Sequence, residues 1–115
     1  MFLTILFINY SLLFWKLSNK EGLGKDVSGG YVSDMLSDVL ANSSAGDIWI
    51  TFQTHTNIVA VANLKNLAGV ILVNNRQPDE ETLKKAETEK VTLITSDMST
   101  FETAGRIYQL MKEKE

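Results

Sequence analysis

The chain of 115 residues contains no cysteine and a single histidine. The lack of cysteine excludes disulfides, thiolate metal sites and cysteine nucleophiles. A single histidine, without cysteine, is too few for a typical zinc site, and it gives little support for a Ser/His/Asp catalytic triad. Basic residues are also the minority, because 11 Lys and Arg stand against 14 Asp and Glu and give a net charge of −3. This balance argues against a nucleic-acid binder, which needs a basic surface to neutralise phosphates.

The sequence also lacks an apolar run long enough to cross a bilayer, which takes about 20 residues. Its most apolar stretch is Met1–Trp15, where only Thr4, Asn9 and Ser11 are polar. This stretch lacks the basic start and the small-residue cleavage site of a signal peptide. We interpret it as a buried helix and strand, or as a surface masked in an oligomer. A membrane-associated or signal-like segment and an atypical or mis-assigned start are the alternatives. With no disulfide and an acidic surface, we expect a cytoplasmic protein.

Length and an ordinary composition predict one domain over residues 1–115, with an atypical apolar segment at 1–18 and a solvated tail at 112–115. Four short apolar runs of β type recur along it, each followed by a small polar cluster and a helix-like segment. The runs are Val27–Val32, Ile48–Phe52, Val70–Val73 and Val91–Thr95. Strands that alternate with helices at this spacing predict an α/β fold with a parallel or mostly parallel sheet.

The helix-like segments have recognisable starts, since Asp34 is a favourable N-cap and Pro78 suits a first turn. We expect helices from Asp34 to about Asn42, from Thr56 to about Leu67, from Pro78 to about Glu89, and from a cap at Asp97 or Ser99 onward. The apolar residues expected to face inward on the last helix are Phe101, Ala104, Ile107, Tyr108 and Met111. Trp49, in the middle of a strand, is expected in the core or in an interface.

The polar clusters after the four strands form the candidate site, because open α/β sheets usually bind ligands at the carboxyl ends of their strands. The first cluster is Ser33-Asp34. The candidate ligand-binding residues come from the other three clusters and are Thr54, His55, Thr56, Asn57, Asn74, Asn75, Arg76, Ser96 and Asp97. No residue is assigned a catalytic role, and no metal or cofactor is expected.

Each cluster also has a purely structural interpretation. His55 is the side chain that would titrate near neutrality, and with its neighbours and helix amides it could bind a phosphate or a base. Alternatively, Thr56 or Asn57 caps the helix while His55 bonds to a neighbouring loop. Asn74-Asn75 indicates a tight turn with left-handed residues, from which Arg76 could clamp an anion. Ser96-Asp97 suits a cap as well as a site.

Two further patterns are weaker. Gly22-Leu23-Gly24-Lys25 resembles a phosphate loop, but a P-loop needs GxxxxGK[ST] between a strand and a helix. Here Asp26 follows the lysine and a strand comes next, so we interpret this segment as a turn. Asp34, Asp97 and His55 could together approach a metal, although one histidine and two separated aspartates give this idea little support.

The sequence resembles the DRTGG domain family, which is similar to the N-terminal domain of HPr kinase/phosphatase. The resemblance covers roughly Gly22 to Met111 and extends to small stand-alone members found beside hydrogenase subunits. The residues that carry it are Gly30–Leu40, Gly46-Asp47, Ala68–Leu72, Pro78–Glu81 and Asp97–Ala104. The Asp-Arg-Thr-Gly-Gly motif from which the family takes its name is not present in this sequence. Thr54–Asn57 and Asn74-Asn75 stand at positions near which it would fall.

The resemblance implies a three-layer α/β/α regulatory or assembly module with a mostly parallel sheet of four to five strands, often dimeric. Kinase activity is not expected, because the ATP-binding loop of HPr kinase belongs to a separate domain. Two hypotheses follow. In the first, the chain is a non-catalytic regulatory module that binds a small anion such as a nucleotide.

In the second hypothesis, the chain is a protein-interaction or assembly module with no small ligand. It would form a homodimer, with Met1–Trp15 contributing apolar contacts, or dock to a partner enzyme such as a hydrogenase. An enzyme is the weakest option, because the sequence shows no nucleophile–base pair and no metal cluster.

Overall fold

The computed structural model describes residues 3–6, 8, 16–17, 22 and 24–113, and its centre is a five-stranded sheet with the order β2-β7-β6-β5-β4. The strands are β2 (Lys16–Leu17), β4 (Gly29–Val32), β5 (Asp47–Thr51), β6 (Gly69–Leu72) and β7 (Leu93–Thr95). Strands β4 to β7 are parallel to one another, and β2 pairs antiparallel with β7. The predicted mostly parallel sheet is therefore confirmed.

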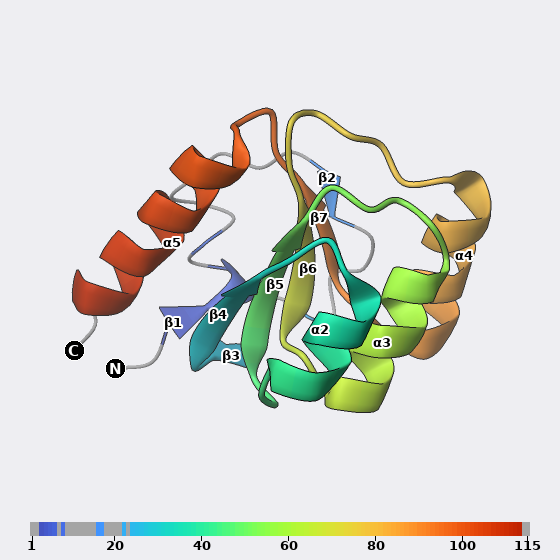
Figure 1. The fold of residues 1–115 in the computed structure, drawn as a ribbon, viewed down its shortest axis with the longest axis horizontal. Helices are drawn as coiled ribbons and strands as arrows, with labels where there is room; N and C mark the ends of the chain where they lie inside the picture. The colour runs from blue at the N-terminus through green and yellow to red at the C-terminus, as the bar shows by residue number, and fades with distance from the viewer. Residues whose placement is uncertain (1–2, 7, 9–15, 18–21, 23, 114–115) are drawn as a thin grey trace.

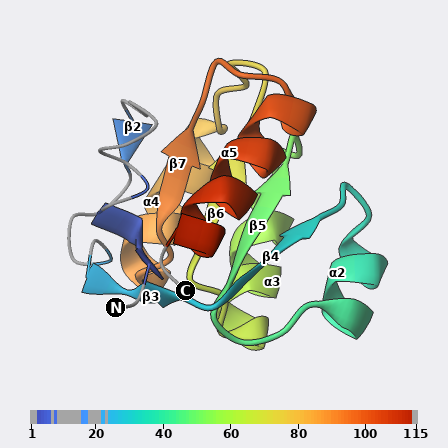
Figure 2. The ribbon, with the colours of Figure 1, turned by 90° about the vertical axis from the view of Figure 1, so that its left-hand side faces the viewer.

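Helices cover both faces of this sheet (Figure 1). One face carries α2 (Leu36–Asn42), α3 (Asn57–Lys65) and α4 (Glu80–Glu89), and the other carries α5 (Thr100–Glu113). A small antiparallel ribbon of β1 (Leu3–Thr4) and β3 (Asp26–Val27) lies on the α5 side, as Figure 2 shows. The three-layer α/β/α architecture implied by the family resemblance is thus confirmed.

The strand order explains this division of the helices. Strands β4, β5, β6 and β7 follow one another in both sequence and space. A right-handed crossover between parallel strands that always advances in one direction puts every connecting helix on the same face. This accounts for α2, α3 and α4 in one layer. The chain then passes to the opposite face, where α5 packs on β4 and β5.

Alternate residues of each strand enter two separate cores, as the two-residue period of a strand requires. Ile48 and Ile50 face the α5 layer, whereas Trp49 faces the layer of α2, α3 and α4. All three side chains are buried, and the Trp49 indole Nε1 donates to the Ser33 carbonyl over 2.8 Å. The prediction that Trp49 belongs to the core is confirmed.

Several described residues of the apolar N-terminal segment are folded onto the chain's own core, whereas Leu6 is 54% exposed. Leu3, Ile5 and Ile8 are at most 3% exposed and belong to the core beneath α5. This confirms the buried interpretation for these residues; the other positions of Met1–Trp15, apart from Thr4 and Leu6, lie outside the described residues. Within the described ranges, no helix is both long enough and apolar enough to span a membrane.

Two local expectations at the first strand and helix are wrong. The expected strand Val27–Val32 is interrupted at Ser28, whose N–H donates to the Gly46 carbonyl over 3.0 Å. The first helix begins at Leu36 with Met35 as its N-cap residue, so Asp34 is not the cap. Met35 itself is 64% exposed. Asp34 instead bonds to the next strand, as described below.

Of the five residues expected to face inward on the last helix, Ile107 is buried and Ala104 and Met111 pack against the core, which confirms the expectation for these three. Phe101 and Tyr108, which were expected to face inward, are 88% and 63% exposed. Thr103 and Ile107 are the buried positions of α5. Only a narrow side of α5 faces the sheet. The apolar stripe predicted from the sequence is wider than this side, so its outer residues are exposed. The alternative cap Ser99 is confirmed, since its Oγ accepts from the Glu102 N–H over 3.1 Å.

The turn before β5 depends on a glycine. Gly46 has φ of +87°, and a Cβ added there would collide with Ser28 Oγ. We expect Gly46→Ala to lower the free energy of unfolding by about 1–3 kcal/mol, because an L residue is strained at this φ. Gly105→Ala is the matched control: it lies in α5 with open space around it, so it should stabilise by roughly 0.5–1 kcal/mol. Urea unfolding of both variants measures the difference, and equal effects would contradict this account.

A hydrogen-bonded carboxylate joins β4 to α2 and predicts a pH dependence. Asp38 Oδ1 accepts from Asn42 Nδ2 and from the Tyr31 hydroxyl, both over 2.8 Å. The bonds from Asn42, Tyr31 and Ser33 lower the pKa of Asp38, and the bond to Asp38 together with partial desolvation raises the pKa of Tyr31.

A carboxylate with a lowered folded pKa stabilises above its unfolded pKa of about 3.9, and this stabilisation is lost as the pH falls through the folded value. We therefore expect Asp38→Ala to be less stable than the parent chain at pH 7, with the difference closing in strong acid. Thermal unfolding from pH 7 to pH 2 measures this. Asp26→Ala, which removes an exposed carboxylate of β3, is the control. A difference that persists unchanged in acid would contradict the assignment.

Candidate functional site

The carboxyl ends of β4 to β7 meet at one edge of the sheet, at the top of Figure 1, and the four polar clusters follow them. A cleft of about 210 Å³ opens there between the loops after β4, β5 and β6. Asp34, Phe52, Gln53 and Arg76 line it. The Arg76 guanidinium carbon lies 5.9 Å from the centre of the Phe52 ring, a cation–π contact that holds the charge beside an apolar surface.

Asp34 builds the wall of this cleft by linking two loops. Its Oδ1 accepts from the Thr51 hydroxyl over 2.8 Å and from the Phe52 N–H over 2.9 Å. The Gln53 side-chain amide donates to the Asp34 carbonyl over 2.9 Å. Both bonds to the carboxylate go to Oδ1, which leaves Oδ2 for a donor in the cleft. Asp34 is therefore a cross-loop acceptor rather than a helix cap.

The turn that carries Arg76 is fixed by backbone bonds to the loop after β7. Asn74 and Asn75 have φ of +56° and +57°, so the predicted left-handed turn is confirmed. The Asn74 N–H donates to the Met98 carbonyl and the Asn75 N–H to the Ser96 carbonyl, both over 2.8 Å. These amides are engaged within the fold, and the side chain of Arg76 is the group that this turn presents to the cleft.

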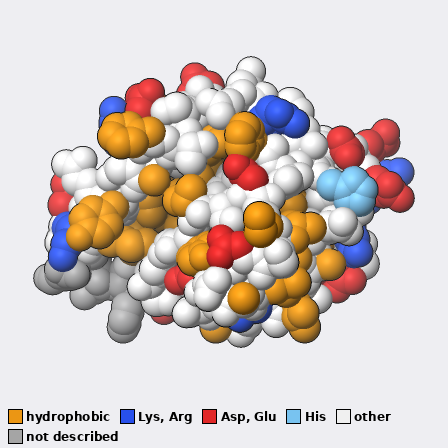
Figure 3. Space-filling model, in the orientation of Figure 1, with side chains coloured by type: hydrophobic (Ala, Val, Ile, Leu, Met, Phe, Trp, Pro, Cys, Tyr) orange, Lys and Arg blue, Asp and Glu red, His pale blue; other side chains and the backbone are white. Residues whose placement is uncertain are grey.

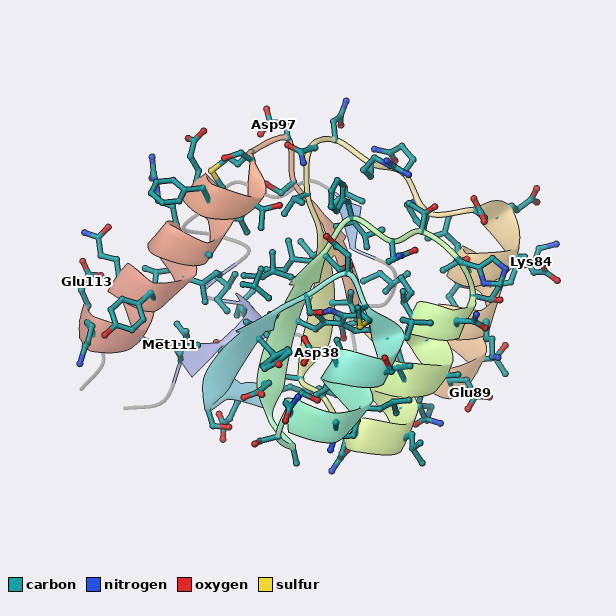
Figure 4. The ribbon with its side chains drawn as sticks, viewed as in Figure 1. Asp38, Lys84, Glu89, Asp97, Met111 and Glu113 are labelled. Atoms are coloured by element: carbon teal, nitrogen blue, oxygen red, sulfur yellow. The ribbon has the colours of Figure 1, made fainter. Side chains whose placement is uncertain are left out.

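Ser96 and Asp97 differ in their surroundings. Ser96 is 1% exposed, and its Oγ accepts from the Met98 N–H over 3.1 Å. This bond closes the turn after β7, so the role of Ser96 is structural, although the cap of α5 is Ser99 and not Ser96 or Asp97. Asp97 is exposed in the loop between β7 and α5 (Figure 4).

The cluster from Thr54 to Asn57 opens α3 with an unusual cap. Thr56 is the N-cap residue of α3, as the structural interpretation expected, but its side chain makes no capping bond. The Asn57 N–H donates instead to His55 Nδ1 over 3.3 Å. The Thr54 carbonyl accepts from the Thr82 hydroxyl over 2.8 Å, which ties this loop to α4.

Of the nine candidate residues, the cleft includes Arg76, and the other eight lie along the same edge without lining it. The sequence analysis does not identify Phe52 or Gln53 as site residues. Phe52 is the last residue of a predicted strand, and a single amide such as Gln53 belongs to no recognisable motif. Their position directly after a buried strand was the available signal. Among the described residues, no group of three His, Asp or Glu side chains is placed to hold a metal ion.

The comparisons with known proteins agree with this fold. The sequence matches the DRTGG domain family over residues 17–110. Among curated proteins, none matches it. A solved structure that resembles it contains the CBS and DRTGG domains of the regulatory region of Clostridium perfringens pyrophosphatase, complexed with the activator diadenosine tetraphosphate. The TM-score is 0.68 at 21% identity, over 84% of this chain and 42% of that one. The chain thus spans less than half of that structure, and the likeness shows a shared fold.

The two bonds to Asp34 predict a stability effect that is separate from ligand binding. Thr51 is 1% exposed, so Asp34→Ala would leave a buried hydroxyl without its acceptor. We expect a loss of about 1–3 kcal/mol in the free energy of unfolding. Asp34→Asn keeps an oxygen acceptor and should retain most of the stability. Urea unfolding compares the two variants. Equal losses of unfolding free energy would show that the negative charge of Asp34, and not its hydrogen-bond acceptor, stabilises the loops.

Proposed function

Because this chain belongs to the DRTGG domain family, we propose that it is a non-catalytic regulatory module that binds a small anionic ligand, such as a nucleotide, at the carboxyl edge of its sheet. The observation that carries the proposal is the position of Arg76 over Phe52 in a cleft at this edge. A guanidinium can hold a phosphate with two parallel hydrogen bonds.

The chemistry of the cleft favours a nucleotide over a simple inorganic anion. Phe52 is 39% exposed and offers a ring on which a base can stack. Asp34 Oδ2 can accept from a sugar hydroxyl or from an amino group of a base. A volume of about 210 Å³ is below the usual range for a whole ligand pocket, so the cleft would hold one moiety while the rest lies along the edge.

The related pyrophosphatase adds support of a different kind. Its regulatory region, which includes a DRTGG domain, is complexed with a nucleotide activator. A regulatory role for the present chain is consistent with that setting. We assign no catalytic residue, and the cytoplasmic location stays a prediction from the cysteine-free, acidic sequence.

We expect a nucleotide at 100 times its dissociation constant to raise the free energy of unfolding by about 2.7 kcal/mol. A panel containing diadenosine tetraphosphate, ATP, AMP and inorganic phosphate, measured by thermal shift and calorimetry, tests this. Arg76→Ala should weaken binding roughly ten- to a hundredfold, because it removes a charged hydrogen-bonding group.

The control is Arg106→Ala, which removes an exposed arginine of α5. It should leave the shift unchanged. The double variant Arg76→Ala/His55→Ala extends the test to the loop before α3. Failure of every ligand to shift the unfolding temperature, or an equal shift in the double variant, would contradict the proposed site.

We also propose a second role in assembly, as a homodimer or docked to a partner enzyme. It is supported by several large apolar side chains that are exposed on β4, α2 and α5. They are Val32, Met35, Leu40, Phe101 and Tyr108. The apolar N-terminal residues Leu3, Ile5 and Ile8 are enclosed in the chain's own core, so this surface, and not those side chains, would meet a partner.

A further inference from the structure

Strand β4 is an open edge of the sheet. Among the described residues it is the terminal strand on one side of the sheet, and β2, which pairs antiparallel with β7, is the terminal strand on the other. Natural proteins commonly protect such an edge with lysine, proline or an inward charge. The sequence of β4 is Gly-Gly-Tyr-Val, which contains none of these, and Val32 is 49% exposed. In the part of the chain that the structure describes, no side chain of β4 protects this short edge, so its outward backbone groups can pair with another strand.

The backbone groups that face outward can be assigned from the pairing with β5. The Ser33 N–H donates to the Ile50 carbonyl, and Tyr31 is in register with Trp49. In a parallel pair, alternate residues direct their N–H and C=O toward the neighbour. Ser33 and Tyr31 therefore face β5, and Gly30 and Val32 direct their N–H and C=O away from the sheet.

An apolar groove of about 230 Å³ runs beside this edge, between β4 and α5. It is lined by Gly30, Val32 and Ile50 from the sheet and by Ala104, Tyr108 and Met111 from α5. A Cβ added at Gly30 would lie 3.9 Å from Met111 Cε, so the groove passes directly over this glycine. Figure 3, which views the molecule from the β4 side, shows hydrophobic side chains gathered around this part of the surface, and Figure 4 shows Met111 at its lower end.

We propose that this edge binds a second copy of the chain, with the β4 strands of the two protomers paired antiparallel about a two-fold axis at Tyr31. The proposal deepens the assembly role above and rests on it. In this register, Gly30 stands opposite Val32 of the partner subunit, and Val32 stands opposite the partner's Gly30. Both are residues with outward N–H and C=O groups, so two hydrogen-bonded pairs form.

The neighbouring registers fail on backbone grounds. Placing Gly30 opposite itself would bring in Ser28, whose N–H already donates to Gly46. Placing Val32 opposite itself would pair Gly30 with Asp34, which lies beyond the end of β4. The register about Tyr31 is the one that keeps both pairs within the strand.

The side chains in this register are complementary. Residues directly opposite in an antiparallel pair project from the same face, so the partner's Val32 would lie over the groove where Gly30 has no side chain. Paired strands lie about 4.8 Å apart, so two α5 helices that each pack over β4 and β5 would run antiparallel at about 10 Å, a normal helix-packing distance. Tyr108 would lie between them.

The strand pair alone is too small for a stable dimer, because a specific interface buries more than about 1,000 Å² in total. The exposed apolar residues on both sides of β4 supply the remaining area: Phe101 and Tyr108 on α5, and Met35 next to α2. An apolar surface that continues over the helices on both sides of an open strand fits a second protomer of the same shape better than a single extended peptide.

The test is sedimentation equilibrium over a concentration series, with Val32→Lys as the variant and Leu64→Lys as the control. Leu64 is 76% exposed on α3, so the control adds the same charge away from the groove. We expect a dimer whose dissociation constant rises at least about tenfold in Val32→Lys and is unchanged in Leu64→Lys. In the unaltered chain, the Gly30 and Val32 amides should gain protection from hydrogen exchange as concentration rises, whereas the Tyr31 amide is protected throughout.

The outcomes separate the interface from the assembly role. If Val32→Lys leaves the dimer dissociation constant unchanged, or if the Gly30 and Val32 amides of the dimer exchange rapidly, the proposed interface is wrong. The chain would still form a dimer, so the assembly role would remain. A monomer at millimolar concentration overturns this interface and the homodimer, and it leaves only docking to a partner enzyme for the assembly role. Association only with another protein overturns the second copy as the occupant. The exchange measurement needs no substitution, so a variant that fails to fold does not weaken the test.

Discussion

The parallel pairing of β5 and β6 is the constraint on which the other features depend. Each strand is flanked by parallel neighbours and buried on both faces, so neither can end in a simple hairpin. Helices must return the chain, and their common hand puts three of them in one layer. The carboxyl ends of β4 to β7 then meet at one end of the sheet. Strand β4, the first of the series, forms a lateral edge that no described strand covers. The candidate cleft and the open edge both follow from this arrangement.

At the carboxyl edge, the polar residues first satisfy the loops that they belong to. Ser96 and the amides of Asn74 and Asn75 bond within the two turns, and Asp34 bonds across to β5. Loops without regular structure need such bonds, because a buried backbone or hydroxyl group without a partner is costly. A polar cluster after a strand is therefore more often structural than functional. Arg76 differs, since its charge lies against an aromatic ring and not in an ion pair within the described residues.

Much of the fold was predictable because its signals are local. The continuous apolar run Val70–Val73 identifies a strand buried on both faces, and Asn74-Asn75 identifies a left-handed turn. The errors concern relations between distant segments. Asp34 next to a helix looks like a cap, and only the position of Thr51 shows its other partner. The pattern of α5 identifies an apolar stripe, but Phe101 and Tyr108 remain exposed because the helix lies near the β4 edge, where no element of the described residues covers them. The cleft needed Phe52 and Arg76 to meet, which no spacing in the sequence records.

The two proposed surfaces are connected through the backbone. Val32 of the open edge and Asp34 of the cleft are separated by Ser33, whose N–H bonds to Ile50 and whose carbonyl accepts from Trp49. Ser33 is thus held on both sides by the core strand β5. A ligand that bonds to Asp34 would contact the same short segment that fixes the direction of the Val32 N–H and C=O groups. Binding free energies that are coupled are reciprocal, so whatever a ligand adds to dimer stability the dimer adds to ligand affinity. Ser33, whose carbonyl accepts from the buried Trp49 indole, is the residue through which a coupling between the two proposed surfaces would pass.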